Sequence, residues 1–144
     1  MKLLERLRFR SRWHGLAVVV LAAFFVAAGV NHFVNPDFYR PMMPTYLPAP
    51  MMLIYVSGFF EVLGGAGVLV PRLRRIAGWG LVALLIAVFP AHVHMVQNPE
   101  SFEDIPYWGL VVRMPLQLLL IGWVWFATLV PRRQKDAERK SACA

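Results

Sequence analysis

The residues best able to do chemistry in this sequence are polar side chains set inside long apolar stretches. Glu61 and Arg113 are the two charged residues that lie deepest in such stretches. A charge at bilayer depth costs about 2.5–3.5 kcal/mol on insertion scales, so it usually faces the protein interior and finds a partner. This carboxylate and guanidinium could orient a ligand or exchange a proton with it, or they could clasp two helices together. Both interpretations stay open on the residues alone.

Other polar residues are spaced so that they join the same site. Ser57 precedes Glu61 by four residues, and Arg113 precedes Gln117 by four, which places each pair on one helix face. At about 1.5 Å per residue, the depths of Glu61 and Arg113 differ by roughly 7–8 Å, which a leaning arginine side chain can cover. The alternative is that Arg113 extends outward to the membrane interface. Residues such as Gln117 and Ser57 more often form hydrogen bonds between membrane helices than contacts with a ligand. The predicted polar pocket consists of Glu61, Arg113, Gln117, Ser57, His32 and Asn31.

The chain contains few residues that could bind a metal or a cofactor. The only cysteine is Cys143, so no internal disulfide, CxxC pair or cysteine-ligated metal site can form. His92 and His94 are two residues apart, so on a regular helix they point in different directions and cannot bind one cofactor together. We therefore predict no metal site, no catalytic residue and no encoded cofactor, and contact with a quinone is left open.

Four apolar stretches must position these groups. They run over about residues 14–34, 50–70, 76–96 and 107–130, and a helix needs about 20 residues to cross a bilayer. The 144 residues are 58% hydrophobic with a mean hydropathy of +0.54, which is more apolar surface than a soluble domain of this size can bury. We expect an all-α, four-helix transmembrane bundle that forms a single integral membrane domain over residues 1–144.

The positions of the basic residues decide what the net charge of +7 means. They gather in the tails 1–12 and 131–144 and in the turn 72–75. Basic residues favour the cytoplasmic side of a membrane, so this alternation predicts cytoplasmic termini and external connections at 35–49 and 97–106. A nucleic-acid-binding surface would not alternate in this way. We therefore expect the lipid bilayer as a partner and no nucleic acid.

The first external connection, residues 35–50, has an unusual composition. It contains five prolines, which exclude a regular helix. Its many apolar side chains disfavour a freely solvated loop. We expect a semi-rigid, proline-rich outer loop that caps the bundle, and the alternative is an ordinary connector with an interfacial aromatic belt.

A set of short motifs follows in order between Gly29 and Trp125. They are His32-Phe33, Pro36, Tyr39, Met42-Met43-Pro44, Tyr46-Leu47-Pro48, Pro50, Ser57-Gly58, Glu61, Gly64-Gly65, Pro71-Arg72, Arg75, Phe89-Pro90-Ala91 and Arg113-Met114-Pro115-Leu116-Gln117. This set resembles the DoxX-like family of small four-span membrane proteins. That family usually shows Asn where His92 stands and often Tyr where His94 stands, so the resemblance implies no role for these two histidines.

The resemblance implies a multi-pass protein of the bacterial inner (plasma) membrane, linked to quinol-oxidase or thiosulfate:quinone oxidoreductase subunits or to redox-stress complexes. The favoured hypothesis is a non-catalytic accessory subunit of a membrane redox or quinone-linked system, at most a subunit of an oxidoreductase. It would work with a membrane or peripheral protein partner. The alternatives are a structural or assembly protein, in which Glu61 and Arg113 form a clasp, and a small-solute or proton-coupled carrier.

Overall fold

The computed structural model describes residues 12–102 and 105–130, and the regular structure within them is entirely helical. Four helical segments are long and apolar enough to cross a membrane, which indicates a multi-pass protein in contact with lipid. They are α2 (Arg12–Val34), α4 (Pro50–Leu69), α5 (Arg74–Gln97) and α6 (Tyr107–Val124), the last continued by the π-helical turn η3 (Trp125–Leu129). Shorter helices are α3 (Pro36–Tyr39), η1 (Arg40–Met42) and η2 (Pro99–Phe102). The all-α class and the four candidate spans are confirmed.

The helices begin and end close to the predicted residues, but the last turn of the fourth span has a different helix type. The predicted tails 1–12 and 131–144 lie outside the described residues, except for Arg12, where α2 begins. The fourth span is not α-helical to its end, because it changes to a π-turn at Trp125. Thr128 donates its hydroxyl to the Val124 carbonyl at 2.6 Å. This is the carbonyl that an α-helix would pair with the amide of Thr128, and such a bond competes with the regular backbone pattern.

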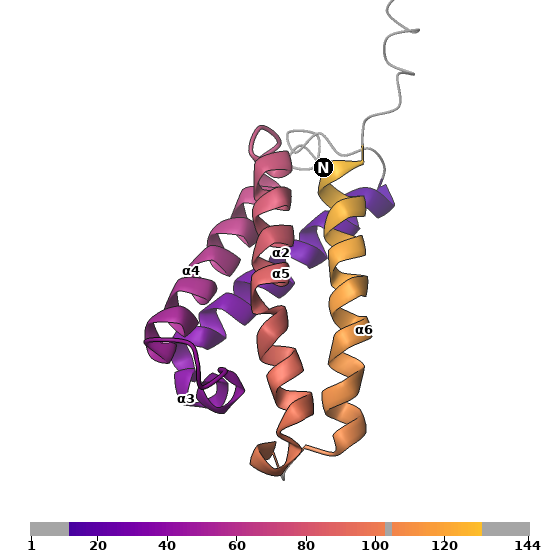
Figure 1. Ribbon diagram of the computed structural model, residues 1–144. Helices are drawn as coiled ribbons and strands as arrows, with labels where there is room; N and C mark the ends of the chain where they lie inside the picture. The colour runs from indigo at the N-terminus through magenta and orange to yellow at the C-terminus, as the bar shows by residue number, and fades with distance from the viewer. Residues whose placement is uncertain (1–11, 103–104, 131–144) are drawn as a thin grey trace, which may run out of the picture.

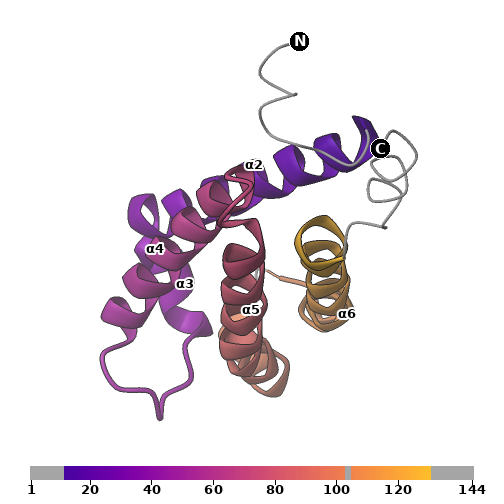
Figure 2. The same ribbon diagram turned by 90° about the horizontal axis from the view of Figure 1, so that it is seen from above.

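The long helices pack in chain order and form an open arc. α2 packs along α4, α4 packs on α5, and α5 packs on α6 (Figures 1 and 2). α2 crosses the bundle obliquely and meets the fourth span mainly at η3, while α2 and α6 themselves barely touch. The C-terminal end of α2 therefore diverges from α6, and the arc closes only at the η3 end.

Two glycines set the close approach of α2 and α4. A Cβ atom at Gly29 would lie 2.6 Å from the Gly58 carbonyl oxygen, and one at Gly58 would lie 2.6 Å from the Cβ of His32. Only glycine leaves room for backbones at this separation, which is how small residues act in membrane helix contacts. The crossing brings His32 of α2 beside Glu61 of α4.

Buried apolar side chains form two clusters at opposite ends of the bundle. The larger cluster lies at the η3 end and consists of Val18, Leu21, Ala22, Phe25, Val68, Leu81, Val82, Leu85, Val124 and Ala127. The smaller cluster lies where α5 ends and α6 begins and consists of Met42, Met95, Phe102 and Leu110. The polar residues of interest lie between these two clusters.

The arginines of the 72–75 turn were expected only to flank a span, but Arg74 is buried and makes a hydrogen bond. Its side chain is 7% exposed, and its Nε donates to the Val68 carbonyl at 2.8 Å. The last carbonyls of a helix have no partner within the helix, and a cation near them is favourable. Arg74 thus stabilises the end of α4, whereas Arg72 and Arg75 are exposed.

Candidate functional site

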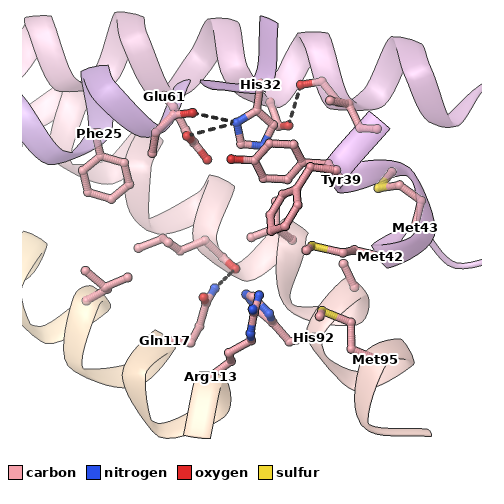
Figure 3. Close-up of a pocket in the computed structure, with 18 of the residues that line it drawn as sticks. Phe25, His32, Tyr39, Met42, Met43, Glu61, His92, Met95, Arg113 and Gln117 are labelled. Atoms are coloured by element: carbon pink, nitrogen blue, oxygen red, sulfur yellow. Dashed lines mark hydrogen bonds and ion pairs between the residues drawn. The ribbon is translucent and has the colours of Figure 1, made fainter. Parts of the chain in front are cut away.

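A cavity of about 330 Å³ lies between the two apolar clusters and is lined by all four long helices together with the α3–η1 segment (Figure 3). Most of the lining is apolar or aromatic. Its polar side chains are His32, Tyr39, Ser57, Glu61, His92, Arg113 and Gln117. Of the six residues predicted for the polar pocket, the structure therefore brings five together on one cavity.

One wall of the cavity carries His32 and Glu61, whose side chains are 11% and 13% exposed. His32 Nδ1 donates to the Ala28 carbonyl at 3.0 Å, which fixes the orientation of the imidazole ring. Glu61 Oε2 lies 3.6 Å from the same nitrogen. That oxygen is buried and has no hydrogen-bond partner within the described part of the chain.

Tyr39, which also lines the cavity, and Asn31 hold this wall in place. The Tyr39 ring stacks on His32, with ring centroids 3.9 Å apart and an interplanar angle of 16°. Asn31 Nδ2 donates to the Tyr39 hydroxyl at 2.7 Å, and Asn35 Nδ2 donates to Asn31 Oδ1 at 2.7 Å. Asn31 thus lies outside the cavity lining, unlike the other predicted pocket residues, and acts on the site through Tyr39.

The opposite wall carries Arg113, Gln117 and His92. Gln117 Nε2 donates to the Leu85 carbonyl and so joins α6 to α5. His92 has Gln117 and Arg113 as polar neighbours, and its Nδ1 is buried without a hydrogen-bond partner among residues 12–102 and 105–130. This wall offers hydrogen-bond donors from Arg113 and an imidazole nitrogen to whatever occupies the cavity.

The direct contact between Glu61 and Arg113, one of the two arrangements open on the sequence, is not formed. The two side chains point toward the cavity from opposite walls (Figure 3), and no ion pair joins them. The ionisable side chain nearest to the Glu61 carboxylate is His32, whose Nδ1 lies 3.6 Å from Oε2. The physical reason is the glycine crossing, which brings α2 closer to Glu61 than α6 is. A structural clasp made of these two residues therefore lacks its central contact.

Ser57 and His94 make local contacts. Ser57 lines the cavity, but its hydroxyl donates to the Ile54 carbonyl of its own helix at 2.9 Å. Asn98 Nδ2 lies 3.0 Å from His94 Nδ1 and donates to the His94 carbonyl at 2.8 Å, so His94 belongs to the end of α5. His92 faces the cavity and His94 does not, which confirms that the two histidines point in different directions.

The predicted site lacked two residues that the structure places there, His92 and Tyr39. A signal for His92 exists in the sequence, since Leu85, Val88, His92 and Met95 follow helical spacing and all line the cavity. No comparable periodicity marks Tyr39, which lies in the short α3 helix of the proline-rich connection.

The two unpartnered atoms, Glu61 Oε2 and His92 Nδ1, define what the cavity can do. Buried polar groups in proteins are nearly always hydrogen-bonded, so such atoms indicate where a ligand or a water binds. The space between them is apolar and aromatic, as in most small-molecule sites. Within the described residues, no group of three or more His, Cys, Asp or Glu side chains could hold a metal ion.

The chain matches a model of a protein family. A family model described as "Domain of unknown function (DUF8561)" matches residues 21–128. No curated protein and no solved structure matches the chain. The matched range contains both walls of the cavity and the glycine crossing that positions them.

Proposed function

The chain belongs to the family described as domain of unknown function DUF8561, and we propose that it binds a quinone-type headgroup as a non-catalytic accessory subunit of a membrane redox system. One observation carries the proposal. Two buried polar atoms, Glu61 Oε2 and His92 Nδ1, lack partners among the described residues and lie on opposite walls of one largely apolar cavity.

The chemistry of a quinone suits this arrangement. A quinone or quinol is a flat ring with an oxygen at each of two opposite positions. A quinol hydroxyl can donate to the Glu61 carboxylate. An oxygen at the far end can pair with His92 Nδ1 and accept from the Arg113 guanidinium, which only donates. Tyr39 and Phe25 supply aromatic surface to the same cavity, and aromatic rings prefer offset or edge-to-face contacts with one another.

This proposal assigns binding and orientation to the chain and assigns electron transfer to a protein partner. The carboxylate, imidazole and guanidinium groups of the lining can hold a ring, orient it and exchange protons with it. The resemblance to the DoxX-like family supports the same role, because members of that family are linked to quinone-dependent complexes.

The topology and the location belong to the same proposal. The alternation of basic residues supports cytoplasmic termini and an external α3–η1 end. Tyr39, Met42 and Met43 line the cavity from the proline-rich connection, which supports its role as an outer cap. The resemblance supports the bacterial inner membrane as the location.

The test is the quinone content of the purified full-length protein, measured in its lipid extract. We expect bound quinone in the wild type and about tenfold less in Glu61→Gln, since the loss of a charged partner changes affinity by at least about 1.4 kcal/mol. Glu100→Gln, an exposed carboxylate in η2, is the matched control and should retain the wild-type amount. A wild-type protein that carries no quinone and binds none when it is added contradicts the proposal.

A second candidate is a structural or assembly protein, and one observation favours it. The Gln117 side chain joins α6 to α5 through the Leu85 carbonyl, which is the interhelical role that polar membrane residues often play. This candidate predicts that Glu61→Gln lowers stability without any quinone being involved. A carrier is less well supported, because the larger apolar cluster fills the bundle at the η3 end, beyond the polar cavity.

A further inference from the structure

We infer that the cavity opens sideways to the lipid between α2 and α6, and that its ligand therefore carries a long apolar tail that lies in the bilayer. This inference rests on the proposed function and specifies the form of the ligand and its route. The passage between α2 and α6 is called the lateral opening below, and it is bordered by Phe24 of α2 and Leu120 of α6.

The packing of the helices leaves one side of the cavity without a helix-to-helix contact. α4 and α5 close the cavity between α2 and α6, since each neighbouring pair in the arc is packed. The turn η3 closes the arc at one end by its contact with α2, and the α3–η1 segment lines the cavity at the other end. α2 and α6 barely touch, and the ribbon views show them diverging away from η3 (Figures 1 and 2).

The side chains at this gap belong both to the cavity and to the outer surface of the bundle. Phe24 lines the cavity and is 45% exposed, whereas the adjacent Phe25 lines the same cavity and is 2% exposed. Leu120 lines the cavity from α6 and is half-buried. The wall of the cavity thus continues through these residues onto a surface that faces lipid.

An opening to the lipid favours ligands that partition into the bilayer. Phe24 and Leu120 are apolar and lie well inside their transmembrane helices, so a free polar solute would have to enter lipid before it reached them. A headgroup with an apolar tail partitions into the bilayer and reaches the lateral opening by diffusion in the membrane plane. Its polar atoms then meet Glu61 and His92, while its tail stays against Phe24 and Leu120.

The test joins the two sides of the lateral opening in the full chain. Cys143, the only natural cysteine, is first replaced by serine. Phe24→Cys and Leu120→Cys are then introduced together and linked by a bis-methanethiosulfonate reagent, and a reductant cleaves this link. The measurement is the exchange rate of a benzoquinone with a decyl chain between nanodisc-embedded protein and lipid vesicles. We expect exchange at least about tenfold slower in the linked protein and normal exchange after reduction.

The control links two helices that are already packed. Leu63→Cys on α4 and Ile86→Cys on α5 are exposed positions, and their linkage should leave the exchange rate unchanged. A variant that needs no thiol chemistry gives a second measurement. Leu120→Trp narrows the lateral opening and should slow exchange severalfold, whereas Leu119→Trp on the 68% exposed side of the same helix should not.

The outcomes separate this inference from the proposed function. Normal exchange in both the linked protein and Leu120→Trp overturns the lateral opening and leaves the quinone site intact. The affinities for the same ring with and without the decyl chain are also compared, each calculated from the concentration of the compound within the membrane. Equal affinities overturn the requirement for an apolar tail. Failure of the unlinked wild type to bind either ring overturns the proposed function itself.

Discussion

The α2–α4 crossing places the imidazole of His32 beside Glu61, and the Nδ1 hydrogen of that histidine is directed to the Ala28 carbonyl. The carboxylate keeps an unpartnered oxygen within the described part of the site. A buried polar atom without a partner costs about 1–3 kcal/mol, and a ligand hydroxyl that donates to this oxygen recovers that cost. If the proposed ligand binds as described, the unmet hydrogen-bonding capacity of Glu61 contributes directly to its affinity.

At the residue scale, Tyr39 tests whether the orientation of His32 matters for binding. Tyr39→Phe keeps the ring that stacks on His32 and removes the hydroxyl that accepts from Asn31, while Tyr39→Leu removes the stack as well. Aromatic pairs contribute about 0.5–1.5 kcal/mol beyond burial, so we expect Tyr39→Leu to weaken quinone binding by about 2- to 13-fold. We expect Tyr39→Phe to weaken it less than Tyr39→Leu does, because the stacked ring remains.

Quinone titration of the two purified variants measures this difference. Tyr46→Phe, at an exposed tyrosine of the same connection, is the control. An equal loss of affinity in Tyr39→Phe and Tyr39→Leu would show that the hydroxyl contact, and not the stacked ring, positions the site.

At the scale of the helices, the α2–α4 crossing is the element that assembles the site. Gly58→Ala places a methyl group 2.6 Å from His32 Cβ and 2.8 Å from the Gly29 carbonyl oxygen, so the helices must move apart. Overpacking of this kind costs about 1–3 kcal/mol. We expect Gly58→Ala to lower the free energy of unfolding by that amount and to reduce bound quinone, because His32 moves away from Glu61.

Gly122→Ala is the matched control, since a Cβ at Gly122 meets nothing within 4 Å. It should change stability by less than about 0.5 kcal/mol, as most open surface positions do. Unfolding of both variants is followed by circular dichroism during denaturant titration. A Gly58→Ala protein with wild-type stability and wild-type quinone content would show that the crossing does not position the site.

The same crossing explains which parts of the site the sequence could predict. Counting residues along a span gives the depth of a side chain, and the depths of Glu61, Arg113 and Gln117 did place them on one cavity. Depth does not identify the nearest helix, so the sequence could not predict that His32 would lie beside the carboxylate in place of Arg113. That choice depends on contact between Gly29 and Gly58, which belong to different helices.

The fold was more predictable than the site because its signals are local. Hydropathy and length alone located four spans, and the observed helices agree with them to within about two residues at most ends. The π-turn at Trp125 and the buried position of Arg74 were not predictable in this way. The π-turn and the burial of Arg74 depend on contacts that form only in the folded chain, such as the hydrogen bond from Arg74 to the Val68 carbonyl.

At the scale of the whole molecule, the two ends of the bundle differ in chemistry. The η3 end is filled by the larger apolar cluster, whereas the cavity and its polar lining lie toward the α3 end. Arg12 and the arginines of the 72–75 turn lie at the η3 end, and the basic tails adjoin α2 and η3 in the sequence. The proposed topology therefore places the cavity in the outer half of the membrane, where an external partner could reach it.

This topology predicts which positions a membrane-impermeant maleimide labels in intact cells. In a Cys143→Ser background, Thr45→Cys and Ser101→Cys lie in the two proposed external connections, and Arg72→Cys lies in the proposed cytoplasmic turn. All three positions are exposed, so accessibility depends on the side of the membrane alone. Since basic residues are retained on the cytoplasmic side, we expect Thr45→Cys and Ser101→Cys to be labelled in intact cells and Arg72→Cys only after permeabilisation. The reverse pattern would place the cavity in the inner half and would require its protein partner to be cytoplasmic.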